Sequence, residues 1–517
     1  MDTLGNRKWW ALVALTLVVV VVGIDATVLN LALPALAGAL HASSAELQWF
    51  VAAYSLAVPA MLLPAGLLGD RYGRRRMLLG ALAVFGAGSL ACAYAPSAGA
   101  FIAARLLLGL AAAFLVTLSL AVLPVLFAEQ ERPRAVGIWA AANFVSLPIG
   151  PLLGGWLLTH FWWGTVFLIN VPVVGLAIVA TLALLPESRS PVRPGLDPLG
   201  VLTSSAGLAG IIYGIIQGGQ QGWGDAGALG PLLGGVLLLG AFVLWERRVS
   251  RRPAGQPLVD LGLFRSPSFT WGTLLAAVGI FPLFGVMFAL SQYWQAVLGV
   301  DAQGAGLRLL PVIAGLVVGA GVADRVAARA GAKLTVAGGF AVLAGAMIAG
   351  GTTSLSSGDG FTAVWTAVTG AGTGLALATA ANAALGALPA ERSGVGSALM
   401  QAVQKVGAPF AVAILGAALN AGYRDHLALA GLPAPAAAAV QQSVYGGLAI
   451  ARQLGSAALA DSVRQAFVAG LDAALWVCAG LALAALVLAL AFLPRRVAEP
   501  GATDAAGVQL RHEVVRS

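Results

Sequence analysis

Long apolar segments recur along the whole chain and limit what it can fold into. A membrane-crossing helix needs about 20 mostly apolar residues to span roughly 30 Å of hydrocarbon. Segments of this kind lie at 9–33, 47–68, 77–95, 99–124, 135–158, 163–185, 198–218, 226–245, 269–294, 304–327, 334–354, 361–384, 395–420 and 468–493. Only 10% of the 517 residues are charged, too few to coat a globule of this size. The fourteen segments therefore predict an all-α integral membrane protein.

Basic residues between these segments predict the topology. If the N-terminus is cytoplasmic, every inner segment carries Lys or Arg, from Arg7 and Lys8 to Arg495 and Arg496. The short outer loops carry neither, except Arg308 at the rim of a helix. This asymmetry is typical of multi-pass proteins of a cell inner (cytoplasmic) membrane and places both termini in the cytoplasm. It also assigns the net charge of +8 to topology, so we expect no nucleic-acid partner.

The first apolar segment has an alternative interpretation. A basic start followed by an apolar run and small residues at Ala35–Ala37 resembles a cleavable signal peptide. The length of the run and the acid Asp25 within it favour a membrane helix.

Reactive and metal-binding residue types are sparse. Cys92 and Cys478 fall in apolar stretches, so we expect no disulfide. The four histidines are scattered, so sequence neighbours cannot form a metal site. No Walker motif, which would bind the phosphates of ATP, occurs in the chain. We therefore expect no cofactor, and an ion gradient as the source of energy.

An internal repeat divides the chain. Arg71-Tyr-Gly73-Arg74-Arg75 recurs 258 residues later as Arg329-Ala-Gly331-Ala-Lys333. Duplicated six-helix halves are a transporter architecture. We expect a bundle at 1–190, two inserted helices with a cytoplasmic linker at 191–265, a bundle at 266–496 with a long outer loop at 421–466, and a disordered cytoplasmic tail at 497–517.

Two motifs stand out, one in the loop between two predicted helices and one inside a predicted helix. Gly69, Asp70, Arg71, Gly73, Arg74 and Arg75 join the second and third helices, where the acid can pair with an arginine of the loop. Arginines that serve only as topology anchors are the alternative. In the fifth helix Gly150, Pro151, Gly154 and Gly155 form a small-residue run that favours close helix packing and a bend.

These motifs resemble those of the major facilitator superfamily, over nearly the whole chain. The loop at Asp70 is similar to its signature loop, and the run Ser146–Gly155 is similar to the motif of its proton-coupled exporters, with Ser146 where a glycine is usual. Asp25-Ala-Thr27-Val-Leu-Asn30 and Phe167-Leu-Ile-Asn170-Val-Pro172 resemble signatures of its fourteen-helix drug:proton antiporters. Arg105-Leu-Leu-Leu-Gly109 resembles its intramembrane arginine motif.

The resemblance implies two six-helix bundles plus two inserted central helices. It also implies that Asp70 with Arg71 and Arg75 latches a cytoplasmic gate, to which Arg329, Gly331 and Lys333 contribute in the second copy. There Ala328 replaces the acid, which puts a second latch of the same form in doubt.

Charged residues inside predicted spans are candidates for the mechanism because burial in lipid costs several kcal/mol. Asp25 and Arg105 fall at similar depth, so we expect a proton-coupling pair, with a purely structural ion pair as the alternative. Lys405 lies near the middle of the thirteenth span and is expected to face a cavity. Other candidates for a substrate cavity are Asn30, Asn143, Phe281, Phe284, Phe288 and Gln401, although lipid-facing or packed roles suit the aromatic residues equally.

The sequence therefore predicts a proton-driven antiporter, not an enzyme, that exports lipophilic, cationic or aromatic drugs by alternating access. Its expected partners are a small-molecule substrate, protons and membrane lipids, and we expect a monomer. The alternatives are a dedicated exporter of one natural product, a lipid-moving relative, a membrane enzyme or a sensor.

Overall fold

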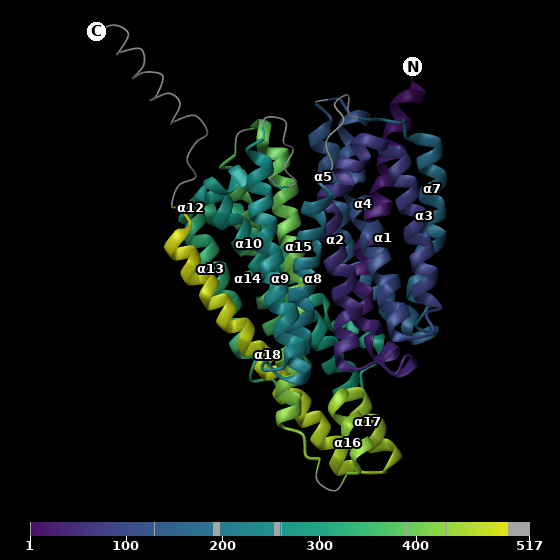
Figure 1. Cartoon of the computed structure of the whole chain (residues 1–517), viewed down its shortest axis with the longest axis vertical. Coiled ribbons are helices and arrows are strands. Elements are labelled where there is room, and N and C mark those ends of the chain that lie inside the picture. Colours follow the sequence, from purple (N-terminus) through teal and green to yellow (C-terminus); the bar gives the residue numbers. More distant parts are fainter. Residues whose placement is uncertain are drawn as a thin grey trace, which may run out of the picture.

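The computed structural model describes residues 2–128, 130–189, 197–252, 259, 261–388, 390–429 and 432–494. Within these ranges the chain is helical apart from its connections, and no strand occurs. The long helices run roughly parallel across the molecule and form two bundles that stand side by side (Figure 1).

The first bundle contains the first seven helices. They are α1 (Asp2–Ala39), α2 (Ser44–Tyr72), α3 (Arg74–Ala93), α4 (Ala98–Leu126), α5 (Arg132–His160), α6 (Thr165–Leu168) and α7 (Asn170–Leu184). The short α6 and α7 follow one another as a single span, Thr165–Leu184. The buried side chains of these helices form one apolar core.

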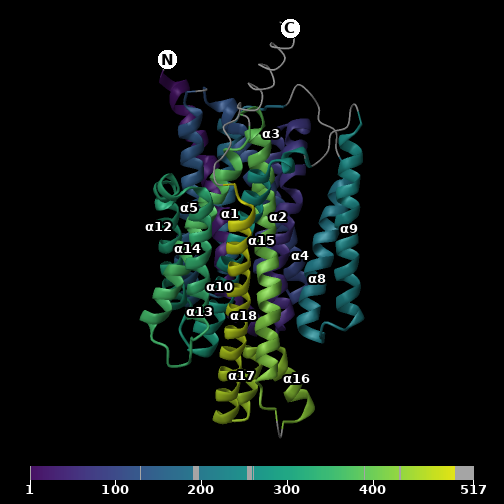
Figure 2. The same cartoon turned by 90° about the vertical axis from the view of Figure 1, so that its left-hand side faces the viewer.

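Two further helices stand beside the bundles (Figure 2). They are α8 (Pro198–Gln221) and α9 (Ala226–Ser250), followed by the short 3-10 helix η1 (Leu261–Arg265). Helix α8 packs on α2 and α15 through a small apolar cluster that includes Ala52, Ile212 and Ala413. The Asn420 side chain of α15 donates to the Gly219 carbonyl of α8 at 2.9 Å.

The second bundle contains the remaining elements. They are α10 (Pro267–Gln292), the π-helical turn η2 (Tyr293–Val297), α11 (Ala302–Arg308), α12 (Leu310–Ala330), α13 (Ala332–Gly350), α14 (Asp359–Leu385), α15 (Ala390–Asp425), α16 (Ala434–Gln442), α17 (Val444–Gln453) and α18 (Ala457–Phe492). A second apolar core lies between them.

The predicted all-α membrane fold is confirmed, and its helices are compatible with fourteen spans. Thirteen helical segments of the described chain are long and apolar enough to cross a membrane. Helix α5, with 29 residues, packs between α1 and α11 and adds the fourteenth.

The predicted outer loop at 421–466 differs from the structure. Helix α15 continues to Asp425, α18 begins at Ala457, and two short helices lie between them. The Tyr423 hydroxyl donates to the Val440 carbonyl at 2.8 Å and ties α16 to α15. A helix that projects beyond the bilayer needs no apolar surface there, so a hydropathy signal ends before the helix does. The predicted tail at 497–517 lies outside the described residues.

The internal repeat appears in the backbone. Gly73 joins α2 to α3 and Gly331 joins α12 to α13, and both have positive φ, 111° and 81°. A residue with a side chain rarely adopts such angles, so glycine permits each tight connection. The two copies therefore make the same kind of turn.

Two described hydrogen bonds between the bundles lie in the half of the molecule farther from the start of α1. There the Ser291 hydroxyl of α10 donates to the Asn30 carbonyl of α1. Nearby, the Gln295 amide donates to the Leu31 carbonyl at 3.1 Å. The two bundles are thus joined at this face, the far face, which also carries α16 and α17 (Figure 1).

Candidate functional site

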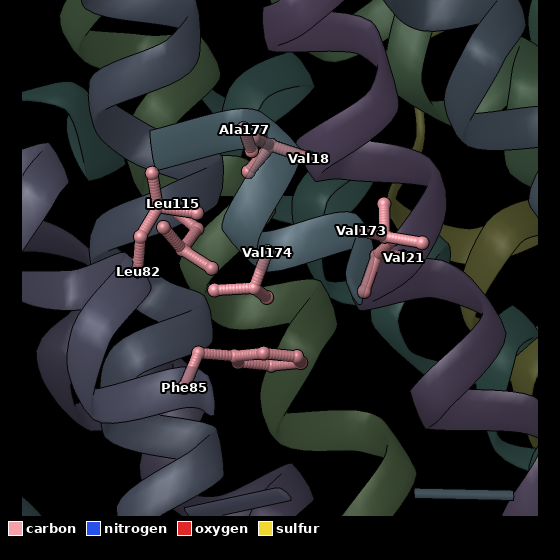
Figure 3. Close-up of a pocket in the computed structure, with 8 residues that line it drawn as sticks. All are labelled: Val18, Val21, Leu82, Phe85, Leu115, Val173, Val174 and Ala177. Atoms are coloured by element: carbon pink, nitrogen blue, oxygen red, sulfur yellow. The ribbon is translucent and has the colours of Figure 1, made fainter. Parts of the chain in front are cut away.

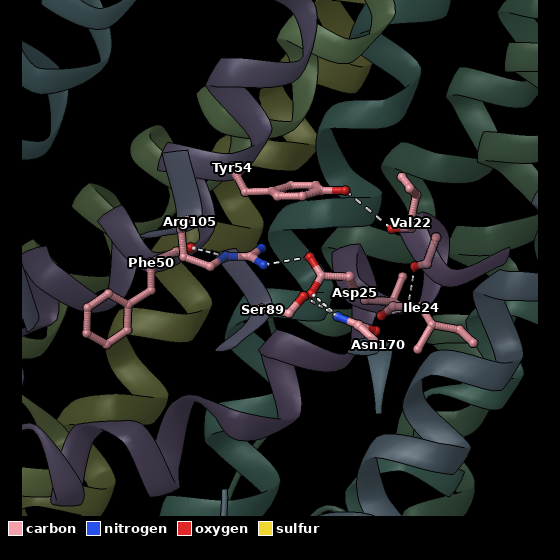
Figure 4. A network of polar contacts seen from close by, with 10 residues as sticks. Val22, Ile24, Asp25, Phe50, Tyr54, Ser89, Arg105 and Asn170 are labelled. Atoms are coloured by element: carbon pink, nitrogen blue, oxygen red, sulfur yellow. Dashed lines mark hydrogen bonds and ion pairs between the residues drawn. The ribbon is translucent and has the colours of Figure 1, made fainter. Parts of the chain in front are cut away.

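A buried ion pair joins α1 to α4 in the first bundle (Figure 4). Arg105 Nη1 lies 2.7 Å from Asp25 Oδ2, and the side chains are 1% and 0% exposed. The two residues that the sequence placed at similar depth are therefore in direct contact.

Neutral groups complete the surroundings of this pair. Asn170 Nδ2 donates to Asp25 Oδ1 at 3.1 Å and lies 3.2 Å from Ser89 Oγ. Arg105 Nε donates to the Phe50 carbonyl at 3.2 Å. The break between α6 and α7 places Asn170 at the first position of α7. Sequence reasoning quoted Asn170 only as part of a motif, because nothing in the chain indicates its distant partner.

Tyr54 connects the ion pair to a cavity. The Arg105 guanidinium carbon lies 4.4 Å from the centre of the Tyr54 ring, a cation–π contact. The Tyr54 hydroxyl donates to the Val22 carbonyl at 3.3 Å. The Tyr54 side chain also lines a cavity of about 60 Å³ between the two bundles. One aromatic ring thus contacts both the embedded charges and the cavity, a role that the sequence analysis missed.

The cavity contains three of the predicted residues: Asn143 from α5, Phe284 from α10 and Lys405 from α15. The other four residues predicted for the cavity do not line it. Asn30 is 1% exposed, Phe281 belongs to the second core, Phe288 belongs to the first core, and Gln401 is half-buried. For Phe281 and Phe288 the packed alternative matches the structure.

An apolar crevice inside the first bundle is too small to be a ligand site (Figure 3). It has about 10 Å³ of space and is lined by aliphatic side chains and Phe85. A water molecule needs about that volume together with polar partners. The crevice is therefore a packing space between helices.

The glycine run of α5 lies against α1 and against the second bundle. A Cβ at Gly150 would collide with the Thr27 side chain of α1, and one at Gly154 would collide with Val28. A Cβ at Gly155 would lie 2.8 Å from the carbonyl oxygen of Ala302 in α11. Small residues are thus required where α5 makes its closest contacts, including one contact between the bundles.

Ser146 stands where the motif usually has a glycine, and its side chain packs against a glycine of α1. Its hydroxyl lies where a Cβ at Gly23 of α1 would be, and it donates to the Asn143 carbonyl at 2.6 Å. The larger side chain on α5 is therefore accommodated by a missing one on α1.

The charged loop between α2 and α3 forms contacts within its own bundle. Asp70 pairs with Arg74 at 2.8 Å, rather than with Arg71 or Arg75. Arg75 donates to the Leu182 carbonyl at 2.6 Å, and the Arg71 guanidinium lies over the Tyr72 ring. The described contacts of this loop do not cross to the second bundle.

In the second copy, Asp324 has a partner of a different kind. Its carboxylate accepts from the Asn382 amide at 2.9 Å. Arg329 and Lys333 flank Gly331 as the repeat predicted, and the structure gives neither an ion pair within the described residues.

A second ion pair lies at the same end of the molecule as Asp70. Lys8 Nζ lies 2.7 Å from the Glu131 carboxylate, joining α1 to the residue before α5. The hydrogen bond from Lys8 holds the pKa of Glu131 below its ordinary value. The sequence analysis gave Glu131 no role, because nothing in the chain indicates that Lys8 lies beside it.

Two helical bundles with a cavity between them are the architecture of secondary transporters. The chain belongs to the Major Facilitator Superfamily, whose family model matches residues 15–412. It is therefore a multi-pass membrane protein.

Two curated relatives are named as exporters. The chain is 33% identical to the tetracenomycin C resistance and export protein of Streptomyces glaucescens, over 94% of this chain and 92% of the relative. It is 34% identical to the multidrug efflux pump LfrA of Mycolicibacterium smegmatis, over 94% of this chain and 97% of the relative.

Solved structures agree on the fold. A bacterial homologue of the human lysosomal transporter Spinster, inward-facing and occupied, matches with a TM-score of 0.68 at 16% identity, over 95% of this chain and 98% of that chain. A D-xylose–proton symporter matches with a TM-score of 0.60 at 14% identity, over 94% and 98%. At these identities the likeness extends to the fold alone.

Proposed function

We propose that the protein is a proton-coupled antiporter that exports lipophilic drugs from the cytoplasm by alternating access. The observation that carries the proposal is the buried pair of Asp25 and Arg105, which shares Tyr54 with the cavity between the bundles. The names of the exporters to which the chain is similar support the direction of transport and the class of substrate.

Coupling rests on the energetics of the embedded charges. Removing one partner of a buried ion pair leaves an uncompensated charge, at a cost of about 3–5 kcal/mol. A proton that binds Asp25 neutralises the carboxylate and releases Arg105 from it, while the Phe50 carbonyl and the Tyr54 ring still hold the guanidinium. When the arginine moves away from Asp25, it also shifts the Tyr54 ring that it contacts. Because this ring lines the cavity, the shape of the cavity changes with it.

Alternating access needs the two bundles to separate at one face and close at the other. In this structure hydrogen bonds and a close backbone contact join them at the far face, where Gly155 of α5 meets Ala302 of α11. If the Arg-rich face is cytoplasmic, as the positive-inside rule indicates, this conformation faces inward. The outward-facing state then requires α5 to leave α11.

The test is substrate-induced proton release in proteoliposomes, with Asp25→Asn as the variant. The amide keeps the shape of the acid but cannot exchange a proton, so we expect drug binding to survive and gradient-driven transport to be lost. Asp461→Asn, which neutralises an exposed acid paired with Arg464 outside the cavity, serves as the matched control. Full proton-coupled transport by Asp25→Asn would place the proton site elsewhere.

Two other acids would then be examined. Glu46 forms a capping box with Ser43 at the start of α2, which already explains its position. Asp472 of α18 is half-buried, and its Oδ1 has no hydrogen-bond partner within the described residues. Asp472 would therefore be the first alternative.

A further inference from the structure

The cavity between the bundles has a positive charge that is not balanced by a described neighbour. Lys405 is exposed, and its side chain lines the cavity with Tyr54, Ser55, Asn143 and Phe284. Within the part of the chain that the structure describes, Lys405 has neither a hydrogen bond nor an ion pair. Of the eleven residues that line the cavity, it is the one with a basic side chain, and none of the eleven has a carboxylate.

Asp25, the buried acid next to the cavity, already has a hydrogen-bond donor at each of its carboxylate oxygens. Each oxygen of Asp25 has a donor, from Arg105 and from Asn170, and the side chain is 0% exposed. In this conformation the carboxylate therefore cannot offer a counter-charge to a cation in the cavity. The Tyr54 ring, which contacts Arg105, presents an aromatic surface there instead.

We propose that this cavity selects aromatic substrates that carry a negative charge, a carboxylate or a phenolate. The proposal rests on the proposed export function and names the substrate class of the same site. In a medium of low dielectric an unpaired ammonium attracts an anion and repels a second cation more strongly than in water. A charge-assisted hydrogen bond from Lys405 would hold the acidic group.

The remaining lining residues suit the rest of such a molecule. Phe284 and Tyr54 offer ring faces and edges for an aromatic body. The Asn143 amide and the Ser55 hydroxyl can bond further oxygens, and neither side chain is engaged in a hydrogen bond within the described residues. At about 60 Å³ the cavity holds only a few waters, so a drug enters when the bundles move apart. Within the expected class of cationic or aromatic drugs, the proposal therefore favours aromatic substrates that carry a negative charge at this cavity.

The test compares two dyes that share a fused xanthene ring system and differ in charge. Fluorescein carries a carboxylate and a phenolate, and rhodamine 123 carries a delocalised cation. Fluorescence anisotropy of the purified full-length protein in detergent measures binding of each dye. We expect fluorescein to bind at least about tenfold more tightly, a difference of 1.4 kcal/mol.

Variants at position 405 test the source of the preference. Lys405→Met should weaken fluorescein binding by about tenfold or more without weakening rhodamine 123, and Lys405→Arg should restore it. Arg325→Met removes one positive charge from the exposed surface of α12 and should change neither dye. Lys405→Gln replaces Lys405→Met if the latter elutes as an aggregate, because its polar side chain keeps much of the length.

The outcomes separate the inference from the proposed function. Equal binding of the dyes, tighter binding of rhodamine 123, equal losses in Lys405→Met, or binding of neither dye would overturn the inference. Gradient-driven movement of dye in proteoliposomes reports on export. A fluorescein preference that depends on Lys405, in a protein that moves neither dye, would support the inference about the cavity and contradict export.

Discussion

At the scale of single residues, Asn170 is the neutral partner on which the buried ion pair depends. It donates to Asp25 and lies within hydrogen-bond distance of Ser89. Leaving a buried acceptor without its donor costs about 1–3 kcal/mol. We therefore expect Asn170→Ala to lower the melting temperature and to reduce drug transport, measured in detergent and in proteoliposomes.

Ser89→Ala is the matched control, because Ser89 contacts Asn170 without contacting Asp25 in any described hydrogen bond. It should lower the melting temperature less and leave transport close to that of the unmodified protein. If Ser89→Ala impaired transport as strongly as Asn170→Ala, the contact with Asp25 would not be the reason for the loss.

The pair of Lys8 and Glu131 gives a dependence on pH. Because the folded protein lowers the pKa of Glu131 from 4.5, the carboxylate stabilises the fold above that value. The contribution is lost as the pH falls through the lowered pKa and Glu131 becomes protonated. Lys8→Met removes the contact, so its melting temperature should lie slightly below that of the unmodified protein at neutral pH.

The two melting temperatures should converge as the pH is lowered below 4.5. The difference at neutral pH is expected to be small, because water and salt screen an ion pair at the surface. A difference that persists unchanged on acidification would mean that Lys8 stabilises the protein through its contact with Phe127, which does not titrate in this range.

At the scale of elements, α5 is the helix whose small residues permit contact between the bundles. Overpacking a close contact costs roughly 1–3 kcal/mol, which shifts an equilibrium between two conformations about five- to 150-fold. A side chain at Gly155 would press on the backbone of α11. We expect Gly155→Ala to favour the conformation in which the far face is open.

The measurement is labelling of a cysteine at position 143 with a membrane-impermeant maleimide added from outside, with both native cysteines replaced. Gly155→Ala should speed the labelling. Gly345→Ala on α13 is the control, because a Cβ at Gly345 meets no atom within 4 Å. Identical labelling rates in the two variants would show that Gly155 does not govern access.

The helices themselves could be predicted from the sequence, and the contacts between them could not. A membrane span is a local run of apolar residues, so the fourteen spans could be predicted from hydropathy along the chain. The extra turns of α15 and α18 project beyond the predicted spans and give no such signal. The partner of Asp70 is local, because Arg74 lies four residues along the chain, whereas Asn170 lies 145 residues from Asp25 and reaches it only through tertiary packing. Depth in the membrane predicted the pair of Asp25 and Arg105, because depth restricts which charges can meet.

At the scale of the whole molecule, the two faces differ in charge and shape, which allows the orientation in the membrane to be tested. The face that begins with α1 carries the arginine loop, in which the Arg76 side chain is 71% exposed. The far face carries α16, and Gln442 at the end of this helix is exposed. The positive-inside rule places the first face in the cytoplasm.

We expect a cysteine at position 442 to react with an impermeant maleimide in intact cells, and one at position 76 to react only after the cells are permeabilised. Both positions are exposed, so a difference in labelling reports the side of the membrane and not burial. Val440, two residues before Gln442, is fully buried and would be a misleading probe of the same face. Labelling of position 76 but not of 442 in intact cells would reverse the orientation. The conformation closed at the far face would then face outward, and drugs would reach Lys405 from outside the cell.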